Sequence, residues 1–176
     1  MRDTRGASLK LSLAALLTAM GVAVAPLLHF PLLAFKAYPG QHAVNAVAGV
    51  LLGPWWAAGI AVAVGVIRMG MGVGTIYSMP GGIPGALVVG LACSLLRRAG
   101  FKRPEVAALL EPLGTVLIGG TLAVYVVAPL AGHERMVGAL AAVWAAWAAS
   151  SIPGALLGFA VLSALRRVGV LEAVGA

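Results

Sequence analysis

Charged side chains are scarce in this sequence, and their scarcity excludes a soluble globular protein. Of 176 residues only 10% are Asp, Glu, Lys or Arg, whereas 61% are hydrophobic. A soluble domain carries about 25% charged residues, so this chain has too few charges to cover a surface that faces water. We therefore expect an all-α protein that crosses a membrane several times.

Cysteines and catalytic motifs are equally sparse. The single cysteine, Cys93, lies in an apolar stretch, so no disulfide can form within the chain. The sequence contains neither G-x-x-x-x-G-K-[ST] nor H-E-x-x-H, the motifs of a phosphate-binding loop and of a zinc protease. We expect no catalytic residue, no cofactor and no metal site. An intramembrane enzyme is the alternative, in which His29 or His42 would approach Ser150 or Ser151 in space.

Apolar stretches with short polar breaks predict six membrane-spanning helices in one membrane domain, residues 1–176. The predicted spans cover about residues 9–28, 41–53, 54–71, 83–98, 104–130 and 136–165. At about 1.5 Å per residue, the second span covers about 20 Å of a hydrocarbon core that is about 30 Å thick. Its polar start should therefore lie in an outward-facing depression.

Basic residues gather on one side of this topology. Six spans place both termini on the same side, and a cytoplasmic N-terminus puts nine of the twelve basic residues inside, namely Arg2, Arg5, Lys10, Arg97, Arg98, Lys102, Arg103, Arg166 and Arg167. The positive-inside rule then predicts a protein of the cell membrane with cytoplasmic termini. Membrane topology explains the net charge of +7, so we expect the lipid bilayer and no nucleic acid as a partner.

Polar residues interrupt the start of the second span. Helical spacing puts Gln41, His42, Asn45 and Gly49 on one face. An unpaired polar group costs several kcal/mol in hydrocarbon, so these side chains must find partners. Two interpretations are open. The face binds a small polar molecule, or it only joins helices through hydrogen bonds worth about 1 kcal/mol each.

Further candidates lie in the other spans. Arg68 either enters a cavity or extends to the membrane interface, and Glu111 either marks the interface or pairs with a buried cation or ligand. Two tryptophans of the sixth span could be core residues or a flat wall for an aromatic ligand. The predicted substrate-binding set is Gln41, His42, Asn45, Tyr77, Tyr125, Trp144, Trp147 and Ser151, with Arg68 and Glu111 as additional candidates.

Two loops and two stripes of small residues complete the pattern. Residues 29–40 and the glycine-rich residues 70–84 are expected as loops, the second as a lid or a plain connector. Ala15, Ala19 and Ala23 form a stripe on the first span that packs internally or docks another membrane protein. The sixth span carries a stripe that should pack against a neighbouring helix, formed by Ala142, Ala146, Ser150, Gly154 and Gly158.

The segments PGQHAVNAVAGVLLGPWWA (39–57) and IRMGMGVGTIYSMPGGIPGA (67–86) are the most specific in the chain. With six short helices and the A-x-x-x-A stripe, they resemble the S components of energy-coupling factor (ECF) vitamin transporters. Among these S components the two segments resemble the ThiW family most specifically, and the resemblance covers about residues 9–165. It implies a substrate-binding subunit for hydroxyethylthiazole, the thiazole precursor of thiamine.

The resemblance also implies partners and a mode of action. A transmembrane coupling protein and two cytoplasmic ATPases would complete the transporter, with Ala15, Ala19 and Ala23 against the coupling protein. The individual contacts are not carried over from the family. From position and chemistry we expect Trp144 and Trp147 to flank the thiazole ring, and His42 and Asn45 to bond its hydroxyl and nitrogen. An Arg68 that enters the cavity would favour a phosphorylated or carboxylated ligand. The alternatives are thiamine, its pyrimidine precursor, or a membrane scaffold without ligand.

Overall fold

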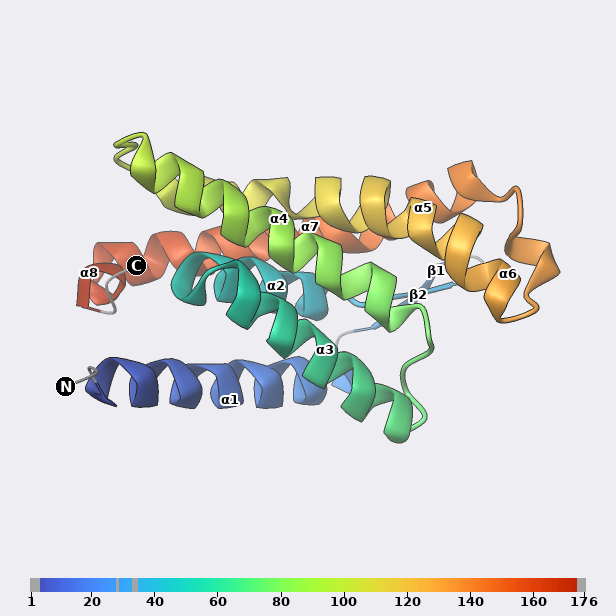
Figure 1. Ribbon diagram of the computed structural model, residues 1–176, viewed down its shortest axis with the longest axis horizontal. Helices are drawn as coiled ribbons and strands as arrows, with labels where there is room; N and C mark the ends of the chain where they lie inside the picture. The colour runs from blue at the N-terminus through green and yellow to red at the C-terminus, as the bar shows by residue number, and fades with distance from the viewer. Residues whose placement is uncertain (1–3, 28, 33–34, 174–176) are drawn as a thin grey trace.

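The computed structural model describes residues 4–27, 29–32 and 35–173, and it is a bundle of helices that run along one long axis (Figure 1). The all-α class predicted above is confirmed, with the addition of one short β-hairpin. In chain order the elements are α1 (Thr4–Leu27), β1 (Phe30–Leu32), β2 (Phe35–Ala37), α2 (Pro39–Leu52), α3 (Pro54–Gly70) and α4 (Ser78–Arg98).

A fifth long helix, Pro104–Leu130, follows α4. It consists of consecutive turns of different pitch: η1 (Pro104–Leu110), η2 (Leu113–Gly119), α5 (Gly120–Leu122), η3 (Ala123–Val127) and α6 (Ala128–Leu130). η1 is a 3₁₀ turn, and η2 and η3 are π-helical. We call the whole segment helix 104–130. The chain ends with η4 (Glu134–Met136), α7 (Leu140–Arg167) and α8 (Val170–Ala173).

Four of the described helices are long and apolar enough to cross a membrane. They are α1 over Gly6–Val24, α4, helix 104–130 and α7. With 17 residues α3 is shorter, and α2 has 14. The prediction of six spans with cytoplasmic termini therefore remains a prediction. The start of α1 and the end of α7 do lie at the same end of the bundle (Figure 1).

The helices begin and end at other residues than the predicted membrane spans. α1 begins at Thr4 rather than at residue 9, and α7 covers Leu140–Arg167 rather than 136–165. α4 begins at Ser78 rather than at residue 83, which confines the predicted 70–84 loop to residues 71–77. Pro80 lies in the first turn of α4, where a helix does not need the missing N–H. The predicted loop at 29–40 contains the hairpin, in which Phe30 pairs with Ala37.

The short helix α2 forms the centre of the bundle. Every residue from Gly40 to Val50 is buried, because α1, α3, α4, helix 104–130 and α7 all pack around it. The α7 stripe faces it, as predicted, from Ala146 to Gly158, whereas Ala142 is exposed. A Cβ added at Gly158 would lie 2.7 Å from the Cβ of Ala46, so the missing side chain lets the two helices come this close.

Candidate ligand-binding site

A cavity of about 460 Å³ opens beside the start of α2. Its walls come from the start of α2, the end of α3, the 71–77 loop, the start of α4, Thr115 and α7. It therefore lies toward the end of the bundle that is opposite the start of α1 (Figure 1). A volume of this size falls within the range of small-molecule sites, about 300–1,000 Å³.

A chain of hydrogen bonds connects the polar side chains at this cavity. Arg68 Nη1 donates to Gln41 Oε1 over 3.3 Å, and Gln41 Nε2 donates to Asn45 Oδ1 over 3.1 Å. Asn45 Nδ2 then lies 3.2 Å from both Glu111 Oε1 and the Gly82 carbonyl, and donates to them. The chain of contacts thus joins α3, α2, α4 and helix 104–130 through side chains that the sequence places far apart.

Glu111 is the point at which this network converges. Its side chain is 0% exposed and accepts hydrogen bonds from His42 Nδ1 at 2.9 Å, from the Thr115 hydroxyl at 2.7 Å and from the Ser151 hydroxyl. Buried carboxylates persist only where charge or hydrogen bonds satisfy both oxygens. Glu111 therefore lies in the interior of the bundle with His42 as its partner on α2, and its pairing with a buried cation or ligand stays a prediction.

Glycine at position 85 makes room for this carboxylate. A Cβ at Gly85 would lie well inside contact distance of Glu111 Oε1 and of the Thr115 hydroxyl. The approach of α4 to helix 104–130 and the position of Glu111 therefore depend on the same missing side chain.

The hydrogen bond to Glu111 also determines what His42 can offer a ligand. Because Nδ1 donates to the carboxylate, Nε2 is the ring nitrogen that is left for other partners, and His42 lines the cavity. A carboxylate that holds one imidazole nitrogen fixes the tautomer and the orientation of the ring. His42 can thus accept a hydrogen bond from a ligand hydroxyl when it is neutral and donate one when it is protonated.

Arg68 lines the cavity and is only 4% exposed. It does not extend to the outside of the bundle. Its guanidinium carbon lies 4.1 Å from the centre of the Tyr38 ring, which is a cation–π contact. The Tyr38 hydroxyl donates to the Val73 carbonyl over 3.1 Å, so the same tyrosine fixes the 71–77 loop beside the cavity.

The 71–77 loop and the 131–139 connection meet at the mouth of the cavity. The Tyr77 hydroxyl lies 2.7 Å from Nδ1 of His133, and Tyr77 and Met136 both line the cavity. Partial burial raises the pKa of the Tyr77 hydroxyl, so Tyr77 stays a neutral donor at physiological pH. Gly72, with φ of +72°, provides a turn that other residues rarely adopt.

Most of the predicted site residues lie at the cavity or directly behind it. Gln41, His42, Arg68, Tyr77 and Trp147 line the cavity, whereas Asn45, Glu111 and Ser151 are fully buried behind it and join its hydrogen-bond network.

Two predicted aromatic residues lie elsewhere. Tyr125 is 57% exposed and does not line the cavity. Trp144 packs on Gly120 of helix 104–130, where an added Cβ would lie 2.8 Å from its Cδ1. Of the two predicted wall residues only Trp147 lines the cavity, because the indole of Trp144 lies between α7 and helix 104–130. We leave both residues out of the site that we propose.

The predicted site set lacks several lining residues, among them Tyr38, Thr75, Ser78, Thr115 and Ser150. Thr115 follows Glu111 by four residues on the same helix, a spacing that could have revealed it. Ser150 accepts the backbone N–H of Tyr38 at 2.7 Å, and thereby ties the start of α2 to α7. Nothing in the sequence pairs these two residues.

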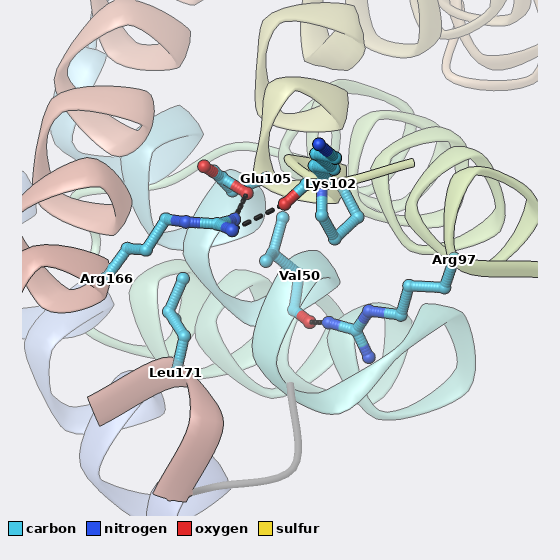
Figure 2. Close-up of a pocket in the computed structure, with 7 residues that line it drawn as sticks. Val50, Arg97, Lys102, Glu105, Arg166 and Leu171 are labelled. Atoms are coloured by element: carbon cyan, nitrogen blue, oxygen red, sulfur yellow. Dashed lines mark hydrogen bonds and ion pairs between the residues drawn. The ribbon is translucent and has the colours of Figure 1, made fainter. Parts of the chain in front are cut away.

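A second, smaller hollow of about 120 Å³ lies at the opposite end of the molecule, among basic side chains (Figure 2). Glu105, also fully buried, accepts hydrogen bonds from Arg166 at 2.7 Å and from Arg103 at 3.0 Å. Arg97 donates to the Val50 carbonyl over 2.6 Å. These contacts tie α7 to the start of helix 104–130 and α4 to the end of α2. The groups satisfy one another, so we assign the hollow a structural role.

Apolar helices of membrane-spanning length around a cavity with polar and aromatic walls define a membrane protein that handles a small molecule. The family model described as Thiamine-precursor transporter protein (ThiW) matches residues 11–168. The chain belongs to this family, which confirms the resemblance that the two sequence segments indicate. Comparisons with curated proteins and with solved structures gave no match. The protein is therefore a membrane transporter protein for a thiamine precursor.

Proposed function

We propose that this protein is the substrate-binding S component of an ECF transporter, and that it captures hydroxyethylthiazole outside the cell. A transmembrane coupling protein and two cytoplasmic ATPases would then drive uptake. The observation that supports this proposal is the hydrogen-bonded network from Arg68 to Glu111 beside a cavity of about 460 Å³. With cytoplasmic termini, this cavity would face outward.

The chemistry of the lining suits a small flat ring with one hydroxyl group. Trp147 offers an aromatic surface for the thiazole ring, and His42 Nε2 can accept a hydrogen bond from the hydroxyl group. Thr75 and Ser78 line the same cavity and can donate to the ring nitrogen. Asn45 already donates to Glu111 and to the Gly82 carbonyl, so its role in the proposal is to position Gln41 and Glu111.

The surface of α1 supports a membrane partner. Ala15, Ala19 and Ala23 are all exposed, while Ala14, Leu17 and Gly21 of the same helix are buried against the bundle. Small residues allow a second helix to approach closely. In the proposal this exposed stripe contacts the coupling protein.

Binding calorimetry on the purified full-length protein tests the proposal. We expect hydroxyethylthiazole to bind more tightly than thiamine or the pyrimidine precursor, and we expect His42→Ala to weaken binding by about tenfold, the ratio that corresponds to 1.4 kcal/mol. Val161→Ala, at an exposed position of α7 far from the cavity, is the control. No heat with any of the three compounds would end the proposal. Tighter binding of thiamine or the pyrimidine precursor would reassign the substrate.

A further inference from the structure

The buried cation of the cavity has no counter-charge. Arg68 is almost fully buried and forms no ion pair with any carboxylate in the described part of the chain. Its guanidinium donates to Gln41 and lies against Tyr38, which contacts it through the ring face and a side-chain hydrogen bond. Its Nε is buried without a hydrogen-bond partner. A guanidinium carries five N–H donors, so most of its bonding capacity in this cavity is unused.

The acidic residues of the chain cannot neutralise Arg68. Only five residues are Asp or Glu. Glu105 pairs with Arg103 and Arg166, and Glu134 is exposed beyond the end of helix 104–130. Glu111 is separated from Arg68 by Gln41 and Asn45, and its oxygens are occupied by four donors. The side chains of Asp3 and Glu172 lie outside the described part.

From this geometry we infer that the cavity is built for a thiazole that carries an anionic group, a phosphate monoester or a carboxylate, which pairs with Arg68. The inference rests on the proposed function, since it takes this cavity as the thiazole site. A guanidinium binds either group through two parallel N–H donors. In a buried site such a pair is much stronger than in water, so the charge should dominate affinity.

The surroundings of Arg68 suit this assignment. Thr75 and Ser78, on the loop and at the start of α4, line the same cavity and add hydroxyl donors. The N–H groups of Ser78 and Met79 already bond the carbonyls of Thr75 and Ile76, so Thr75 and Ser78 contribute donors through their hydroxyls. The tail of the ligand would then lie toward Arg68 and its ring toward Trp147.

A ligand series on the wild-type protein tests the inference. The probes are hydroxyethylthiazole, its phosphate monoester, and 4-methylthiazole-5-acetate, in which a carboxylate replaces the hydroxymethyl end. We expect at least one anionic probe to bind more than tenfold tighter than the neutral alcohol. A difference between the two anions identifies the group. Equal or tighter binding of the neutral alcohol would overturn the inference and leave the proposed function intact, whereas no binding of any probe would remove both.

Two variants assign the preference to Arg68. Arg68→Gln keeps a donor and removes the charge. It should lower the ratio of the affinity for the anionic probe to the affinity for the neutral alcohol at least tenfold below the wild-type ratio. Arg68→Lys keeps the charge and should retain part of the ratio. Arg98→Gln, at an exposed position at the end of α4 and far from the cavity, is the matched control and should change nothing. An undiminished preference in Arg68→Gln would contradict the assignment. If Arg68→Gln does not fold, the wild-type series and Arg68→Lys still decide.

Discussion

At the scale of single residues, Glu111 holds the site together. One carboxylate accepts hydrogen bonds from α2, α7 and its own helix. Hydrogen bonds to a charged group contribute about 1.5–3 kcal/mol each. A connected network of such bonds can stabilise the fold by more than the sum of its individual contacts. Loss of the charge should therefore disturb His42, which faces the cavity, more than it disturbs the distant helix ends.

We expect Glu111→Gln to weaken ligand binding by tenfold or more, because a neutral amide accepts weaker hydrogen bonds from His42 and Asn45 than the carboxylate does. The unfolding free energy should fall by about 1–3 kcal/mol, the cost of an unsatisfied buried polar group. Calorimetry and thermal unfolding measure the two effects. Glu134→Gln, on the exposed 131–139 connection, is the control, and unchanged affinity in Glu111→Gln would exclude the network from binding.

Spacing alone could predict several of these residues. Gln41, His42 and Asn45 share a helical face, and the hydropathy pattern predicts Arg68 within an apolar span. Their burial and their need for partners therefore followed from the sequence. Sequence could not pair His42 with Glu111, 69 residues away. It also could not distinguish Trp147 from Trp144, because the rotation of α7 about its axis depends on packing with helix 104–130.

At the scale of elements, the site depends on how closely α7 and α4 approach α2. Gly154 faces the first turn of α2, where an added Cβ would lie 2.6 Å from the Cβ of His42. Such contacts are far shorter than van der Waals distance, and overpacking of this kind costs about 1–3 kcal/mol. The start of α2 would have to move, and His42 with it.

Gly154→Ala should therefore lower both thermal stability and ligand affinity, with affinity reduced by tenfold or more. Gly59→Ala on α3 is a matched control, because a Cβ there meets nothing within 4 Å. Alanine favours helix over glycine by about 1 kcal/mol, so this variant should be neutral or slightly stabilising. Wild-type affinity in Gly154→Ala would show that the position of α2 is less constrained than the structure indicates.

Hydropathy predicted the existence of the helices better than their ends. The start of α4 contains Pro80, Gly81 and Gly82, which are residues of low helix propensity, so the sequence suggested a loop there. In the structure Gly81 lies beside Trp147 and Gly82 beside Ala61. Tertiary packing, rather than propensity, makes this segment helical. The hairpin at 30–37 was missed because its strands have only three residues each.

At the scale of the whole molecule, the two ends of the bundle differ in chemistry. One end holds the cavity with Arg68 and His42, and the other holds the basic cluster around Glu105 (Figure 2). α1 lies along one side of the bundle (Figure 1) with its small-residue stripe exposed. In the proposed transporter, ligand capture and partner docking thus involve separate surfaces.

The double variant Ala15→Trp with Ala19→Trp should abolish co-purification with the coupling protein and leave ligand affinity within about twofold of wild type. Two indoles would prevent the close helix approach that the alanines allow, and neither position contributes to the cavity. Met20→Trp, at an exposed position outside the stripe, is the control and should keep the complex. Retention of the complex by the double variant would exclude the stripe as the docking surface.

The most direct test of the central claim is an experimental structure of the protein with hydroxyethylthiazole or its anionic analogue bound. We predict that the thiazole ring lies against Trp147, that its substituent points toward Arg68, and that His42 is within hydrogen-bond distance of the ligand. Ligand density outside the cavity beside the start of α2, or a ligand in the cavity with no contact to His42 or Arg68, would contradict the account.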